Sequence, residues 1–92
     1  MKTWLRQIVE RLARDDRTLL KLNLCDKSMS DTDVRAIAAV LRTNSTLQQL
    51  ELCHNEFGVA GAQAIADALR HNSTLQQLDL DMRSSVWYAL IY

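Results

Sequence analysis

The chain has 92 residues, the length of one domain, and its formal net charge at pH 7 is zero because eleven basic residues balance eleven acidic ones. This balance removes the electrostatic reason to expect nucleic acid or an anionic membrane surface as a partner. Two cysteines are too few for a disulfide scaffold, and no stretch approaches the roughly 18 apolar residues of a membrane helix. Charges spread through residues 1–16 do not fit a signal peptide, so we expect a cytoplasmic chain.

The first predicted element is a helix near the N-terminus. Its apolar side chains recur at intervals of three and four residues, which places them on one helical face: Trp4, Leu5, Ile8, Val9 and Leu12. We therefore expect residues 1–17 to form an N-terminal capping helix and a link to the next element.

A repeat of 28 residues organises the chain from residue 18 onward. Residues 44–52 (NSTLQQLEL) and 72–80 (NSTLQQLDL) are identical at eight of nine positions. Residues 18–24 (TLLKLNL) lie one repeat earlier and keep the leucines at the same places. The unit therefore occurs three times.

These copies divide residues 18–83 into repeats 18–45 and 46–73 and a partial repeat 74–83. In each copy, the second and third of three leucines are two residues apart and share one face of a predicted strand. The leucines are Leu19, Leu22 and Leu24, then Leu47, Leu50 and Leu52, then Leu75, Leu78 and Leu80.

The two spacers between these strands are predicted helices, because their apolar residues have helical spacing. Ser30 or Asp31 can accept a hydrogen bond at the start of the first helix. Asn44 and Asn72 follow the last apolar residues, where a left-handed capping conformation suits Asn. A helix of about a dozen residues fits a right-handed crossover between parallel strands and is too long for a hairpin. We expect a curved solenoid of three parallel strands backed by helices.

The middle repeat resembles the ribonuclease-inhibitor-like class of leucine-rich repeats, which is also found in the C-terminal arrays of NOD-like receptors. The matching positions are Leu47, Leu50, Leu52, Asn55, Phe57 and Gly61, followed by an Ala-rich helix. The fold class implied is α/β, a short right-handed leucine-rich-repeat solenoid or horseshoe fragment. The resemblance also implies that the strands line a concave face that binds proteins.

The same resemblance gives Asn55 a structural role. In the family, the Asn after the strand hydrogen-bonds backbone groups in the turn and so joins one coil to the next. The equivalent positions in the outer repeats are Lys27 and Arg83. We therefore expect the outer repeats to be looser than the middle one.

Side chains that alternate with the buried leucines are the candidate contacts for a protein partner. The partner-binding candidates are Lys21, Asn23, Cys25, Gln49, Glu51, Cys53, Gln77, Asp79 and Asp81. Glu51, Asp79 and Asp81 make this stripe mildly acidic, which favours a basic segment on the partner. The alternative interpretation is a solvated polar face with no specific ligand.

Cys25 and Cys53 occupy equivalent positions on neighbouring predicted strands, roughly 4.8 Å apart. Parallel side chains keep their Cβ atoms near that spacing, whereas a relaxed disulfide needs roughly 3.8 Å. A cytoplasmic chain also keeps thiols reduced, so we expect two free cysteines. His54 should project from the opposite side of the strand to Cys53 and His71 lies far away, so we expect no metal site.

Other motifs carry no chemistry in this interpretation. Asn44 and Asn72 each begin an Asn-Ser-Thr glycosylation pattern, but a helix-capping Asn before a polar turn explains both copies through the repeat. No nucleophile, base and orienting group can be assembled, and Gly58 and Gly61 are the only glycines, which excludes a glycine-rich phosphate loop. We expect a protein that is not an enzyme and needs no cofactor.

The last residues, 84–92, no longer follow the repeat and form an apolar tail around Trp87 and Leu90. We expect this tail to fold back as a cap over the last coil. The alternative is that the open end associates with another copy, which would make the chain a structural, self-assembling fragment of a larger repeat protein.

Overall fold

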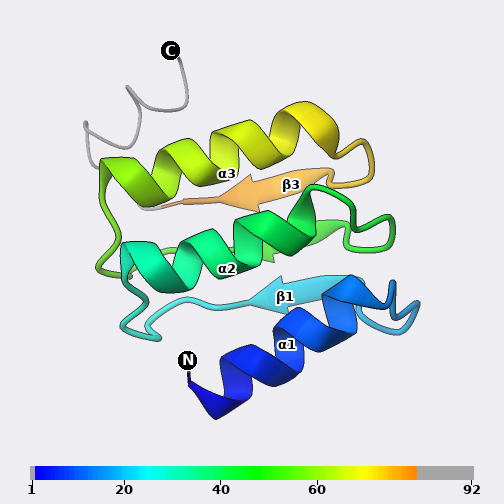
Figure 1. The fold of residues 1–92 in the computed structure, drawn as a ribbon, viewed down its shortest axis with the longest axis horizontal. Helices are drawn as coiled ribbons and strands as arrows, with labels where there is room; N and C mark the ends of the chain where they lie inside the picture. Colours follow the sequence, from blue (N-terminus) through cyan, green and yellow to red (C-terminus); the bar gives the residue numbers. More distant parts are fainter. Residues whose placement is uncertain (1, 81–92) are drawn as a thin grey trace.

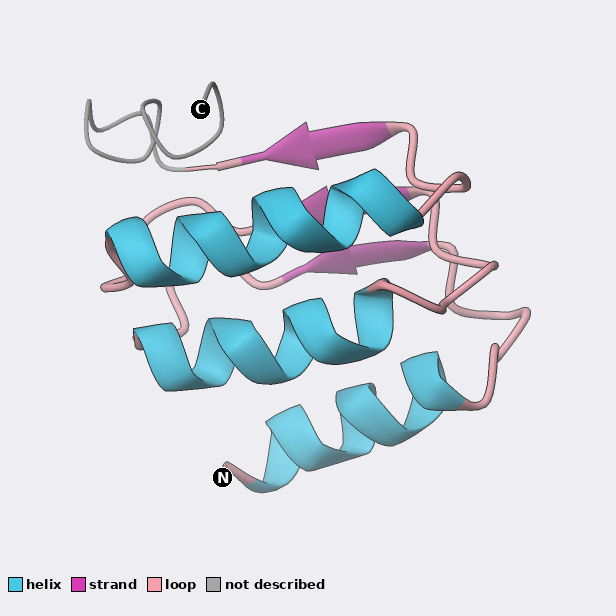
Figure 2. Ribbon diagram, turned by 45° about the horizontal axis from the view of Figure 1, so that its top comes forward, coloured by secondary structure: helices cyan, strands magenta, loops and turns pink. Residues whose placement is uncertain are grey.

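The computed structural model describes residues 2–80. In chain order, the elements are α1 (Thr3–Ala13), β1 (Lys21–Asn23), α2 (Asp31–Leu41), β2 (Gln49–Glu51), α3 (Val59–His71) and β3 (Gln77–Asp79). The helices form one layer and the strands a second layer beside it (Figures 1 and 2). The expected tail at residues 84–92 lies outside the described residues. No helix within residues 2–80 combines the length and the apolar character needed to cross a membrane.

The sheet has the order β1-β2-β3, and both neighbouring pairs are parallel. Leu22 is in register with Leu50, and Leu50 with Leu78, so strand partners are one 28-residue repeat apart. The α/β class and the parallel strands were therefore predicted correctly. Each strand is reached from the previous one through a helix, which returns the chain to the same end of the sheet (Figure 1).

The core lies between the helix layer and the sheet. Leu47, Leu50 and Leu52 are at most 1% exposed, and Phe57 is fully buried beside them. Burying each such side chain contributes about 1.5–3 kcal/mol relative to leaving it in water. Leu5 of α1 belongs to the same core, so the N-terminal helix packs on it.

Asn55 joins two coils through its buried side chain. Its Oδ1 accepts hydrogen bonds from the backbone amides of Lys27 (3.1 Å) and Met29 (3.0 Å) in the preceding coil. Its Nδ2 donates to the carbonyl oxygens of Leu24 (2.8 Å) and Leu52 (2.9 Å). These groups could not otherwise be satisfied away from water, so a single side chain fixes the turns at the ends of β1 and β2.

Asn44 and Asn72 form a second set of links at the opposite end of the strands. Asn44 Nδ2 donates to the Leu12 carbonyl (2.9 Å), and Asn72 Nδ2 donates to the carbonyls of Leu41 (2.7 Å) and Asn44 (2.9 Å). The Oδ1 of each accepts the amide three residues later, at Leu47 and Leu75 (both 2.8 Å).

The expected left-handed backbone at these two asparagines is wrong. Asn72 has φ −96° and ψ 127°, and Asn44 is not among the residues with positive φ. The physical reason is that a non-left-handed backbone aims each side chain inward, where its amide can bond to the preceding coil. A glycan on Asn44 would break a buried hydrogen bond, which agrees with a structural role for this motif.

Asp31 caps the helix of the next coil instead of its own. Its Oδ1 accepts hydrogen bonds from the amides of Gly58 and Gly61, both at 2.8 Å, at the start of α3. A Cβ on Gly61 would lie 2.7 Å from the same oxygen, so this contact requires glycine. The start of α2 is instead set by Ser30, whose amide donates to Asp33 Oδ2 at 3.1 Å.

Candidate functional site

Six polar or charged side chains project from the face of the sheet that the helices leave uncovered. They alternate with the inward leucines along β1, β2 and β3, and all are exposed or half-buried. We name this set the strand face: Lys21, Asn23, Gln49, Glu51, Gln77 and Asp79. These are six of the nine predicted partner-binding residues, and Asp81 lies outside the described residues.

The parallel register arranges the strand face in two rows. The first row holds Lys21, Gln49 and Gln77, which contribute one cation and two amides. The second row holds Asn23, Glu51 and Asp79, so the charge changes from neutral to acidic across the sheet.

The two carboxylates of the second row are direct neighbours on adjacent strands. Partners in register on a sheet lie roughly 5 Å apart, and like charges at that position destabilise the pair. Within residues 2–80, neither Glu51 nor Asp79 has a basic side chain within ion-pair distance. The fold thus keeps an unfavourable juxtaposition that a basic group from outside would relieve.

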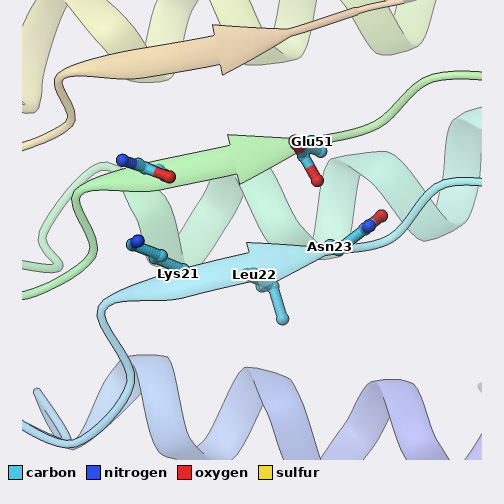
Figure 3. Close-up of a pocket in the computed structure, with 5 residues that line it drawn as sticks. Lys21, Leu22, Asn23 and Glu51 are labelled. Atoms are coloured by element: carbon cyan, nitrogen blue, oxygen red, sulfur yellow. The ribbon is translucent and has the colours of Figure 1, made fainter.

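A shallow hollow of about 310 Å³ lies between β1 and β2 on this face. Lys21, Asn23, Gln49 and Glu51 border it, and Glu51 turns toward β1 (Figure 3). A smaller hollow of about 90 Å³ follows between β2 and β3. Both are open depressions in which strand leucines lie between the polar side chains, which suits contact with another protein surface better than enclosure of a small ligand.

Cys25 and Cys53 are joined by a disulfide, so the expectation of two free thiols is wrong. Their Cα atoms are 4.7 Å apart, within the range that disulfides span. The expectation assumed two side chains standing parallel on a regular sheet. Both residues instead lie past the strand ends, where the side chains can incline toward each other. The two cysteines therefore cross-link neighbouring coils at the edge of the strand face.

His54 follows β2 in a left-handed conformation with φ 56°. The expectation that it would continue the alternation of the strand is therefore not met. Within residues 2–80, no cluster of three His, Cys, Asp or Glu side chains has a geometry that could hold a metal ion. No feature of the strand face therefore points to a metal.

Two carboxylates outside the strand face are stabilised in their charged form. Hydrogen bonds from Thr18 and then Arg11 hold the pKa of Asp16 well below its usual range. A hydrogen bond from Lys2 lowers the pKa of Asp33, against a smaller opposing effect of burial. These contacts tie α1 to the first coil. Lys2, Arg11 and Asp16 precede the repeat that begins at residue 18, so the periodicity that revealed the strands gave no signal for these contacts.

No protein-family model matches the chain, and no curated protein matches it. Solved structures do match. The chain is similar to leiomodin-1 actin-binding site 2, with a TM-score of 0.63 and 21% identity over 88% of this chain and 64% of that chain. It is also similar to the tropomodulin C-terminal domain of Caenorhabditis elegans, with a TM-score of 0.51 and 10% identity over 97% of this chain and 90% of that domain. The chain thus spans about 64% of the length of the leiomodin structure.

These similarities overturn the resemblance to the ribonuclease-inhibitor-like class and to NOD-like receptor arrays. The neighbours in structure are a leiomodin and a tropomodulin domain, and the described strands have only three residues each. The leucine positions report a repeated strand and helix, which many proteins share, and so they do not distinguish one class of repeats from another. What the comparisons establish is a fold similar to the leiomodin and tropomodulin domains.

Proposed function

We propose that this chain is a protein-interaction module that binds a protein partner through the strand face. The observation that carries the proposal is the adjacent pair Glu51 and Asp79, which forms no ion pair within residues 2–80. Both side chains are exposed, and retaining two like charges side by side costs stability that a partner can recover.

The partner that fits best presents a basic segment to the second row. Lysine or arginine opposite Glu51 and Asp79 would replace the repulsion with charge-assisted hydrogen bonds. Asn23 and the glutamines of the first row add donors and acceptors around them. Actin is the first partner to test, because the leiomodin-1 neighbour is described as an actin-binding site.

We also propose that the fold is a short right-handed leucine-rich-repeat solenoid. The support is the 28-residue repeat, the parallel register at that offset and the helix between successive strands. Crossovers of this kind are right-handed in nearly all proteins. In this proposal the strand face is the concave face of the solenoid.

The remaining parts of the proposal concern chemistry and location. We propose that the chain is not an enzyme, needs no cofactor, binds neither nucleic acid nor membrane, and is cytoplasmic. A cytoplasmic location has a consequence for Cys25 and Cys53, because a reducing compartment keeps such pairs as thiols. Treating intact cells with an alkylating reagent tests this location, because only free thiols react. If neither cysteine is alkylated, the disulfide is intact in the cell and the cytoplasmic location is contradicted.

Charge reversal tests the strand face. The native chain and the Glu51→Lys/Asp79→Lys variant are compared in cosedimentation with actin and in quantitative affinity capture from cell extract. We expect the variant to bind these partners at least about tenfold more weakly than the native chain does, because two favourable charge pairs become two repulsive ones. Glu10→Lys, which reverses an exposed charge on α1, is the matched control and should retain binding. An identical set of partners on the native chain and the double variant would contradict the proposal.

The structural alternative, a fragment that assembles with itself, has one observation in its favour. Within residues 2–80, β3 pairs only with β2, so its outer edge presents unpaired backbone groups. Light scattering over a wide concentration range separates the two functions. A monomer throughout would exclude self-assembly, whereas a growing mass would support it.

A further inference from the structure

The helix layer carries a groove that is separate from the strand face. α2 and α3 lie side by side (Figures 1 and 2), and a hollow of about 300 Å³ runs between them on the outer surface. We name it the helix-side groove. Its lining residues are Arg35, Ala38, Ala39, Arg42, Ala64 and Asp67.

The floor of this groove is made of alanines. Ala39 is exposed, Ala64 is half-buried, and Ala38 joins the core below them. Side chains this small leave a trough in which another helix can pack with its axis near the lower end of the usual 8–10 Å separation. The trough is apolar, so an occupant would bury its own larger apolar side chains there.

The rim of the groove is basic, although the whole chain has no net charge. Arg42 pairs with Asp67 across the groove, and Arg70 lies 3.9 Å from the same carboxylate. Asp67 therefore offsets one of these two cations. Arg35 is exposed, and no carboxylate of residues 2–80 lies within ion-pair distance of it. The groove thus retains a net positive charge with one guanidinium unengaged.

The spacing of the two arginines indicates how carboxylates should be spaced on a helix that binds in the groove. Arg35 of α2 and Arg42, the C-cap residue of this helix, are seven residues apart, which corresponds to about 10 Å of helical rise. Two carboxylates seven residues apart on a neighbouring helix match that interval. Arginine binds carboxylates with two parallel hydrogen bonds, which gives the match directional strength.

We propose that the helix-side groove is a docking site for an acidic amphipathic helix of a partner protein. The apolar stripe of that helix lies on the alanine floor. One of its carboxylates engages Arg35, and a second takes the place of Asp67 on Arg42, which leaves Asp67 to Arg70. The groove lies on the helix layer and the strand face on the sheet, so this proposal stands or fails independently of partner binding by Glu51 and Asp79.

The test uses a designed helical peptide of about 18 residues, roughly 27 Å long. It carries leucines on one face, glutamates seven residues apart beside them, and alanine and glutamine elsewhere. Fluorescence anisotropy measures its binding to the native chain. We expect saturable binding that weakens as salt is raised, and that weakens at least about tenfold when the glutamates are replaced by glutamine.

Three protein variants locate the binding. Arg35→Glu removes the unengaged cation and breaks no ion pair seen within residues 2–80, so it should fold normally and bind at least about tenfold more weakly. Ala39→Gln fills the exposed floor without changing the charge and should also weaken binding. Arg17→Glu reverses an exposed arginine that does not line the groove and should bind as the native chain does. Thermal unfolding confirms that each variant is folded.

Several outcomes would overturn the proposal. One is no binding of the peptide to the native chain at about 1 mM. Another is equal binding by the native chain and Arg35→Glu. Self-association that Arg35→Glu abolishes would make a second copy of the chain the occupant. Binding of a single-stranded RNA oligonucleotide in place of the peptide would make the groove a polyanion site.

Discussion

The β1–β2 pair and the β2–β3 pair come from the same repeat but are cross-linked differently. The first pair has a disulfide and the buried side chain of Asn55 at its carboxyl end, in addition to the backbone ladder. At the carboxyl end of the second pair, within residues 2–80, the hydrogen bonds between strands are those of the backbone, such as Leu52 N to Asp79 O.

The leucines of β3 and of the turn before it are also less buried than their equivalents in the middle repeat. Leu47 and Leu50 are at most 1% exposed, whereas their repeat equivalents Leu75 and Leu78 are only partly buried. Asn55 links two coils by reaching back to Lys27 and Met29, and Asn44 and Asn72 likewise reach back to Leu12 and Leu41. Within residues 2–80, a strand is thus buried and cross-linked most where a following coil packs against it.

Alanine at the two equivalent leucines should show the largest contrast. Leu50→Ala removes a fully packed side chain from the centre of the array and should lower the free energy of unfolding by about 2–5 kcal/mol. Leu78→Ala removes a partly exposed one and should cost less. Urea unfolding followed by circular dichroism gives both values, and equal losses would show that the two strand pairs are equally well packed.

Removing the disulfide should make the first pair resemble the second. The bridge closes a loop of 28 residues, which constrains the unfolded chain and typically stabilises the fold by about 2–4 kcal/mol. We expect Cys25→Ser/Cys53→Ser to melt at a lower temperature than the oxidised native chain. Dithiothreitol should lower the native melting temperature in the same way and leave the double variant unchanged. A native chain that is insensitive to dithiothreitol would contradict this expectation.

Asn55→Ala should cost about 1–3 kcal/mol, because it leaves buried amides and carbonyls of two turns without partners. Hydrogen exchange provides the more specific measurement. The amides of Lys27 and Met29 should exchange faster in the variant, while the amide of Leu52, which bonds to Asp79, should change less. Uniform loss of protection would instead show that Asn55 acts on the whole fold.

Gly61→Ala tests the contact between coils at the helix starts. Alanine usually stabilises a helix relative to glycine, by about 0.5–1 kcal/mol. Here its Cβ would lie 2.7 Å from Asp31 Oδ1, so we expect a loss of about 1–3 kcal/mol. In Asp31→Ala, the same Gly61→Ala change should cost less, because only the tight contact with Phe57 at 3.0 Å remains. A double-mutant cycle measures this coupling, and additive effects would remove the proposed clash.

The smallest effect concerns pH and α1. Lys2 lies 3.0 Å from Asp33, and this hydrogen bond lowers the pKa of Asp33 below its ordinary value of 3.8. A carboxyl whose pKa is lower in the folded state stabilises the fold above pH 3.8, and that contribution is lost as pH falls through the folded pKa. The pair is partly exposed, so we expect less than about 1 kcal/mol.

Lys2→Gln provides the comparison for this effect. Stability of the native chain and the variant should differ near neutral pH and converge in acid, as measured by urea unfolding at several pH values. Asp16 also has a lowered pKa, but its partners Thr18 and Arg11 are present in both chains, so its contribution cancels. A difference that stays constant down to pH 2 would exclude Asp33 as the cause.

The sequence was sufficient for the features that repeat. A period of 28 residues fixes which leucines become strand neighbours, and the spacing of apolar residues fixes the helices. The alternation along each strand likewise identifies which side chains point away from the core, including Glu51 and Asp79. These properties follow from the backbone geometry of strands and helices and need no knowledge of distant contacts.

Contacts between different coils were not predictable in the same way. Asp31 is a plausible cap for its own helix, and its partnership with Gly58 and Gly61 depends on how closely two coils approach. The disulfide depends on side-chain directions past the strand ends, which the ideal sheet did not describe. The helix-side groove depends on α2 and α3 being neighbours, so the pattern of either helix alone could not predict that its arginines border a groove.

A nuclear magnetic resonance titration shows directly whether a partner binds through the strand face. The ¹⁵N-labelled chain is mixed with a partner obtained by the capture experiment, and shifted backbone amides are mapped on the structure. We expect the largest shifts on β1, β2 and β3, around Asn23, Glu51 and Asp79. Shifts confined to the helix layer, with the strand amides unmoved, would contradict binding through the sheet.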